Sequence, residues 1–252
     1  MRDQPMQVTR PAASRLPQKR YPASTTPPYA SPRAREKALR IALFTTAVAG
    51  VLVALAALER YRFATEGLRL GAVTSDRFDA LGHRRGIAEV FLVLTGAAAG
   101  VTWLLWFGRI YGNLQALGAH WTRLSIRTAL ICCALPGINL VVAPWLTAEA
   151  WRGSDPAGPD RHPPGTRRLP PLAVTVWTVV LLLTLLIGVV AEKVAHRTLE
   201  QLGPVRSGAP FEAFAAVLVA GSALLTIWLA SSLTARQEAR AAHLAGPPEA
   251  KS

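Results

Sequence analysis

Apolar residues fall in five blocks along the chain, each about the length that crosses a bilayer. The blocks are residues 38–58, 87–107, 128–148, 172–191 and 211–233. Past Arg40, none of them contains a Lys or Arg. A helix rises about 1.5 Å per residue, so a block of about 20 residues reaches across the roughly 30 Å hydrocarbon core. Since lipid offers the backbone no hydrogen-bond partners, the pattern predicts an all-α membrane protein with four to five transmembrane segments.

The third block, residues 128–148, contains helix breakers. Pro136-Gly137 lies in its middle and Pro144 follows near its end. A proline inside a helix removes a backbone hydrogen bond and clashes with the preceding turn. The block therefore either spans the membrane or enters it and returns on the same side. The breakers slightly favour four full spans plus one broken element.

The basic charge bears on this choice. The chain has 252 residues and is 51% hydrophobic, yet it carries 28 Lys and Arg against 15 Asp and Glu, a formal charge of +13. If the third block spans, the cytoplasmic segments hold 15 Lys and Arg and the opposite side 13, whereas a re-entrant block makes these numbers 19 and 9. The positive-inside rule favours the second arrangement, with a cytoplasmic N-terminus. The same excess predicts attraction to anionic lipid headgroups on the cytoplasmic face.

Two polar segments flank the helical membrane domain of residues 38–233. Residues 1–37 are rich in Pro and Arg and predict a disordered cytoplasmic tail, because they contain too little apolar surface to form a core. Residues 234–252 predict a short polar C-terminal tail. Without a folded recognition module in the basic tail, we expect no nucleic-acid binding.

The two asparagines of the chain, Asn113 and Asn139, are both followed by Leu. If the second helix continues past the membrane, Trp106, Arg109 (or Ile110) and Asn113 share one face. We expect a polar cluster at the cytoplasmic membrane face that braces the broken third block, in a structural or functional role. Its members are Arg109, Asn113, Asn139 and Glu149. The alternatives are an ordinary interfacial anchor at this helix end, and a Glu149 that simply ends a spanning helix among solvated side chains.

Tryptophans and glycines suggest how the helices are placed. Tryptophan is enriched at membrane interfaces, so four of them are expected as interface anchors: Trp103, Trp106, Trp145 and Trp151. Gly96 and Gly100 form a small-xxx-small pattern that lets two helix backbones approach closely. We expect them to serve helix packing inside the protein, with homo-oligomer formation as the other use.

The stretch around the asparagines also resembles a known family. Arg109-x-x-x-Asn113-Leu114-x-x-Leu117-Gly118 is followed by Pro136-x-x-Asn139-Leu140, Pro144, Glu149 and Trp151-Arg152. This order and spacing is similar to the DUF4328 family over roughly residues 40–235, although Gly112 and Gln115 stand where the family more often has Arg or another polar residue. The resemblance implies a bacterial cell (inner) membrane protein with several spans, and it implies no biochemical activity.

Signals for catalysis are weak. The five histidines are dispersed, and the chain has no metal-ligand spacing, nucleotide-binding loop or nucleophile motif. Glu89 and Glu212 lie near block ends and are expected to be solvated. We therefore expect no enzyme, no cofactor and no metal site. A scaffold or regulatory protein is the leading hypothesis, and the alternative is a small transporter or lipid-handling protein that uses the broken 128–148 element.

Overall fold

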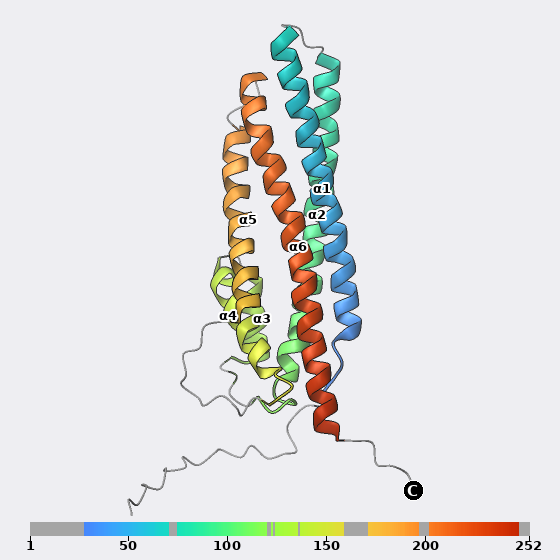
Figure 1. Cartoon of the computed structure of the whole chain (residues 1–252), viewed down its shortest axis with the longest axis vertical. Coiled ribbons are helices and arrows are strands. Elements are labelled where there is room, and N and C mark those ends of the chain that lie inside the picture. Colours follow the sequence, from blue (N-terminus) through green and yellow to red (C-terminus); the bar gives the residue numbers. More distant parts are fainter. Residues whose placement is uncertain are drawn as a thin grey trace, which may run out of the picture.

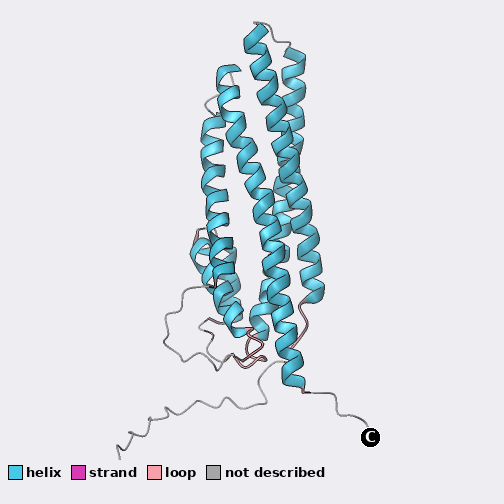
Figure 2. Cartoon of the chain, viewed as in Figure 1, coloured by secondary structure: helices cyan, strands magenta, loops and turns pink. Residues whose placement is uncertain are grey.

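Every regular element in the described part of the chain is a helix (Figures 1 and 2). The computed structural model describes residues 28–70, 75–119, 122, 124–135, 137–158, 171–196 and 202–246. Within them the helices are α1 (Arg33–Leu70), α2 (Ser75–Asn113), α3 (Ile126–Ala134), α4 (Ile138–Gly153), α5 (Leu172–His196) and α6 (Leu202–Ala245). The predicted all-α fold class is confirmed.

Four of these helices, α1, α2, α5 and α6, are long and apolar enough to cross a membrane. Three exceed what a bilayer requires: α1 has 38 residues, α2 has 39 and α6 has 44. Their outer surfaces are apolar, and only 11% of the most apolar 18-residue window of α5 is buried inside the protein. A continuous exposed apolar surface of this size is stable in lipid rather than in water.

The long helices form a row in the order α2, α1, α6, α5, since α1 packs on both α2 and α6, and α6 packs on α5. Figure 1 shows α1 beginning and α6 ending at the same end of the row, which we call the basal end. The opposite end, where α1 leads to α2 and α5 leads to α6, is the distal end. The short helices α3 and α4 lie at the basal end, where α3 contacts α2 and α4 contacts α5.

The apolar block 128–148 is divided between α3 and α4, which have 9 and 16 residues. Gly137, directly before α4, has φ +82°, a conformation that residues with a side chain rarely adopt. Pro136 lies outside the described residues. Pro144 lies inside α4 and does not end it, contrary to our expectation. Neither short helix is among the four of membrane length.

The boundaries of the polar tails differ from the sequence prediction. Residues 234–245, expected in a C-terminal tail, continue α6 without interruption, and residues 33–37 form the first turn of α1. Residues 1–27 and 247–252 lie outside the described residues. The extension of α6 matters because it brings polar side chains against the end of α2.

Two helix backbones approach closely between α1 and α6, at Gly50, rather than at the predicted glycine pair. A Cβ atom built on Gly50 would lie 2.9 Å from the backbone oxygen of Ala216 and 3.4 Å from the backbone nitrogen of Ala220. A Cβ built on Gly96 or Gly100 would meet nothing within 4 Å. The expectation that Gly96 and Gly100 pack helices inside the protein is therefore wrong, and Gly50 has that role.

Replacing Gly50 with Ala should force α1 and α6 apart, because the new methyl group collides with backbone atoms that cannot rotate away. We expect the free energy of unfolding to fall by about 1–3 kcal/mol, measured by thermal unfolding of the purified protein in detergent. Gly96→Ala is the matched control and should be neutral, or stabilising by up to about 1 kcal/mol through helix propensity. Equal effects of the two substitutions would contradict the close α1–α6 contact.

Candidate functional site

Asn113, the last residue of α2, is buried at the basal end, with 3% of its surface exposed. Its Nδ2 donates to the backbone oxygen of Ala30 at 2.8 Å and to Oε1 of Gln237 at 3.1 Å. Its Oδ1 accepts a hydrogen bond from the backbone nitrogen of Ala30 at 3.2 Å. One side-chain amide therefore binds both backbone groups of the residue that lies three positions before α1.

Gln237 of α6 is completely buried and continues this chain of hydrogen bonds. Its Nε2 donates to the backbone oxygen of Ile110 at 2.9 Å and to Oγ of Ser154 at 3.1 Å. The last four carbonyl groups of a helix lack partners within the helix, and Ile110 is one of these in α2. Ser154, directly after α4, in turn donates to the oxygen of Ala150 at 2.7 Å. We call Ala30, Ile110, Asn113, Ser154 and Gln237 the basal network.

The residues after Asn113 explain the Asn-Leu-x-x-Leu-Gly pattern. Leu114 and Leu117 are completely buried, and Gly118 has φ +88°. The glycine allows the chain to reverse after α2, where a side chain would be strained. A Cβ atom built on Gly153 would lie 2.9 Å from Cδ2 of Leu114, so the end of α4 packs closely on this turn.

Trp106 is a buried core residue rather than the interface anchor that the sequence suggested. Its Nε1 donates to Oγ1 of Thr234 at 3.1 Å, one turn of α6 before Gln237. The other three tryptophans are partly accessible. Trp103 stacks on Phe107 with the ring centroids 4.9 Å apart, and Trp145 is exposed. Trp151 lies against the guanidinium of Arg236, with Cζ 4.8 Å from the ring centroid.

The four residues of the predicted polar cluster do not meet as one group. Asn113 and Glu149 are both buried, but Glu149 lies 3.4 Å from the hydroxyl of Tyr111, which donates to it, and is not bonded to Asn113. Arg109 is half-buried, and its guanidinium group forms no hydrogen bond or ion pair with any residue that the structure describes. The half-buried Asn139 uses its backbone nitrogen to bond Leu135 at 3.1 Å, and its side chain bonds none of the described residues.

A second polar group, which sequence reasoning missed, lies toward the distal end. Glu212 of α6 forms two ion pairs. Its Oε1 lies 2.6 Å from Nε of Arg85 in α2, and its Oε2 lies 3.3 Å from a guanidinium nitrogen of Arg60 in α1. Only 12% of the Glu212 side chain is exposed, so the expectation that this residue is solvated is wrong. Arg85 also pairs with Glu89 at 2.7 Å. These four residues, the distal ion cluster, connect α1, α2 and α6.

The basal network and the distal ion cluster each hold helices in position through contacts between their own members. The amides of the basal network are occupied by one another and by backbone groups, and each oxygen of Glu212 has a different arginine. Among the described residues, no three His, Cys, Asp or Glu side chains are placed to hold a metal ion.

Thr234 and Gln237 were missed because the sequence changes from apolar to polar at residue 234. A usable signal was present: Ala230, Leu233, Thr234 and Gln237 follow the three- and four-residue spacing of one helix face.

Comparison with known proteins agrees with the motif. The sequence model described as "Domain of unknown function (DUF4328)" matches residues 68–235, more than half of the chain. This chain belongs to the DUF4328 family. It matches no curated protein and no solved structure. The DUF4328 region contains Ile110, Asn113 and Ser154 of the basal network and ends two residues before Gln237.

Gln237→Ala should destabilise the protein strongly, because Asn113, Ile110 and Ser154 each lose a buried partner. We expect the free energy of unfolding to fall by about 2–4 kcal/mol, measured by thermal unfolding in detergent. Gln115→Ala is the matched control, since Gln115 is exposed beside the same helix end, and it should change stability by less than about 0.5 kcal/mol. In a double-mutant cycle with Asn113→Ala, the coupling should be about 0.5–3 kcal/mol. A coupling of zero would refute the amide pair.

Glu212→Gln should also destabilise the protein, since it leaves two arginines close together without the carboxylate between them. Breaking a buried ion pair on one side costs about 3–5 kcal/mol. Glu59→Gln is the control, because the Glu59 side chain is 52% exposed and its pair with Arg84 is 3.7 Å long, so the loss should stay below about 1 kcal/mol. A loss below about 1 kcal/mol for Glu212→Gln as well would show that the distal ion cluster is not stabilising.

Proposed function

We propose that this DUF4328 protein is a non-enzymatic scaffold or regulatory protein of a bacterial cell membrane. The observation that carries this proposal is the closed basal network, in which the buried amides bind each other and backbone groups. Such an arrangement holds helices in place and leaves the buried donors directed at the protein itself. It makes the basal end a rigid platform that a cytoplasmic partner can bind.

The charge distribution supports a cytoplasmic basal end. The described segments at the basal end carry nine Lys and Arg and those at the distal end carry eight. Over the whole sequence, the re-entrant arrangement assigns 19 Lys and Arg to the cytoplasmic side and 9 to the opposite side. Cytoplasmic segments of membrane proteins hold an excess of such residues close to the membrane. In the proposed topology α1, α2, α5 and α6 each cross once, and α3 and α4 enter from the cytoplasm and return.

The alternative is a small transporter or lipid-handling protein. In addition to the broken element of residues 128–148, one feature of the structure favours it. A groove of about 370 Å³ runs between α2 and α3. Arg109 lines it together with Gly108, Gly112, Ile126 and Leu130. The groove is mostly apolar and open at the surface, so it suits a lipid chain better than a polar solute.

The proposed topology predicts which side of the membrane each loop occupies. In a chain whose Cys132 and Cys133 are replaced by Ser, Arg152→Cys and Gln115→Cys should react with a membrane-impermeant maleimide only after the cells are opened. Asp79→Cys, exposed near the distal end, should react in intact cells. Labelling of Arg152→Cys from outside would show that the third block spans and would overturn the re-entrant arrangement.

Photo-crosslinking in living cells tests the scaffold function itself. A photoreactive amino acid at Gln115, on the basal platform, should give a discrete protein adduct of the same mass in repeated experiments. The same amino acid at Val93, an exposed apolar position on α2, should give lipid adducts only. Adducts to lipid alone at Gln115 and at neighbouring basal positions would refute the scaffold and favour the lipid-handling alternative.

A further inference from the structure

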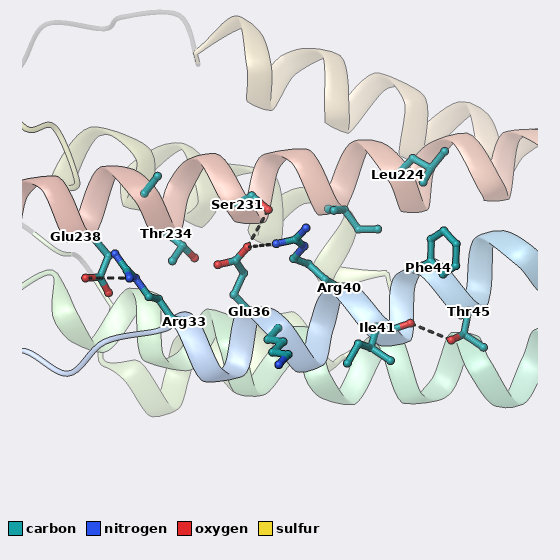
Figure 3. A pocket seen from close by; sticks show the side chains of 13 residues that line it. Arg33, Glu36, Arg40, Ile41, Phe44, Thr45, Leu224, Ser231, Thr234 and Glu238 are labelled. Atoms are coloured by element: carbon teal, nitrogen blue, oxygen red, sulfur yellow. Dashed lines mark hydrogen bonds and ion pairs between the residues drawn. The ribbon is translucent and has the colours of Figure 1, made fainter.

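A second, larger groove of about 790 Å³ lies between α1 and α6 at the basal end (Figure 3). Its lining changes character along its length. The part of the lining nearest the basal end is polar and consists of Arg33, Glu36, Lys37, Arg40, Ser231 and Glu238. Toward the middle of the helices it is apolar, with Ile41, Phe44, Leu224 and Ile227.

The polar half contains one more cation than carboxylates. Both acids are engaged within the groove: Glu36 accepts from Oγ of Ser231 at 2.8 Å and pairs with Arg40 at 3.7 Å, and Glu238 pairs with Arg33 at 3.6 Å. Lys37 is exposed and has no ion pair with any residue that the structure describes.

The two arginines stay available to a ligand. The Arg33 and Arg40 side chains are 73% and 58% exposed, and long ion pairs at such positions contribute little stability. A phosphate offers shorter, charge-assisted hydrogen bonds to the same guanidinium groups. The polar half therefore suits an anion that carries several oxygen acceptors.

The apolar half presents large side chains outward. Ile41 and Phe44 are each 61% exposed and Leu224 is 52% exposed, so the described residues leave more than half of each side chain uncovered. Figure 3 shows the sequence of groups along the groove: Arg33 and Glu238 at one end, Glu36, Ser231 and Arg40 in the middle, and Phe44 and Leu224 at the other end. From Arg33 to Phe44 the helix rises about 16 Å.

We infer that the α1–α6 groove binds an anionic phospholipid, with its phosphate at Lys37 and Arg40 and an acyl chain along Ile41, Phe44 and Leu224. The order of charge and apolar surface matches an amphiphile that stands along the membrane normal with its head at the basal end. The chain's own first 27 residues are a poor occupant, because they carry five Lys and Arg against one Asp. This inference goes beyond the scaffold function and requires only that the helices lie in a membrane.

The test measures which lipid the purified full-length protein retains. The protein in non-ionic detergent receives equal amounts of phosphatidylglycerol and phosphatidylcholine with identical acyl chains, and native mass spectrometry counts the bound lipids. The unaltered protein should prefer phosphatidylglycerol, and Arg40→Gln should lower that preference about fivefold. Arg84→Gln is the matched control, because Arg84 is also exposed and also pairs with a glutamate at 3.7 Å, and it should leave the preference unchanged.

A second pair of variants tests the apolar half. Phe44→Asn should reduce the retention of long-chain phosphatidylglycerol at least about threefold, whereas Phe214→Asn, at an exposed apolar position elsewhere on the outer surface, should not. If Arg40→Gln fails to fold, Lys37→Gln replaces it, since this change breaks no ion pair among the described residues.

Three results would overturn the inference. One is equal retention of the two lipids by the unaltered protein. Another is an equal loss of preference in Arg40→Gln and Arg84→Gln, which would mean general surface charge. The third is displacement of phosphatidylglycerol by inorganic phosphate together with no effect of Phe44→Asn, which would mean a site for free anions.

Discussion

The basal end of this protein depends on one pair of buried amides, Asn113 and Gln237. Each amide has a donor and an acceptor that must be satisfied away from water, and a buried polar group without a partner costs about 1–3 kcal/mol. The pair meets this requirement only when α2 ends beside α6, when the chain before α1 passes within reach of Asn113, and when Ser154 closes α4 against Gln237. Four segments are thereby fixed relative to one another by directional contacts, which apolar packing in lipid cannot supply.

The two ends of the helix row are held by different chemistry. The basal end uses neutral amides and backbone groups, whereas the distal ion cluster uses Glu212 between Arg60 and Arg85. Between them, α1 and α6 approach closely at Gly50 and two alanines, where small residues allow contact between backbones. Because lipid provides no hydrophobic force that drives helices together, polar contacts at both ends and close packing in the middle share the task of association.

The short helices α3 and α4 lie at the basal end and do not run along the row of long helices. They bridge from α2 to α5, which are the two outer helices of the row. The break at Gly137 lets the chain reverse, and the turn at Gly118 delivers it from α2. With both connections at the basal end, basic residues from the N-terminal segment, the α2–α3 turn, the end of α4 and the end of α6 collect on one side. The α1–α6 groove and the α2–α3 groove both open there.

The sequence by itself determined the helical class, the four helices of membrane length and the importance of the stretch that contains Asn113, because apolar block length and residue spacing are local properties. It could not determine that Trp106 is buried, that Gly50 rather than Gly96 and Gly100 sits at a helix contact, or that Glu212 is shielded by two arginines. Each of these depends on which face of a helix meets a neighbour that is distant in the chain. Gln237 shows why these features could not be predicted. It is separated from Asn113 by 124 residues, and only the packing of α6 against the end of α2 brings this residue of an apparently polar tail into the basal network.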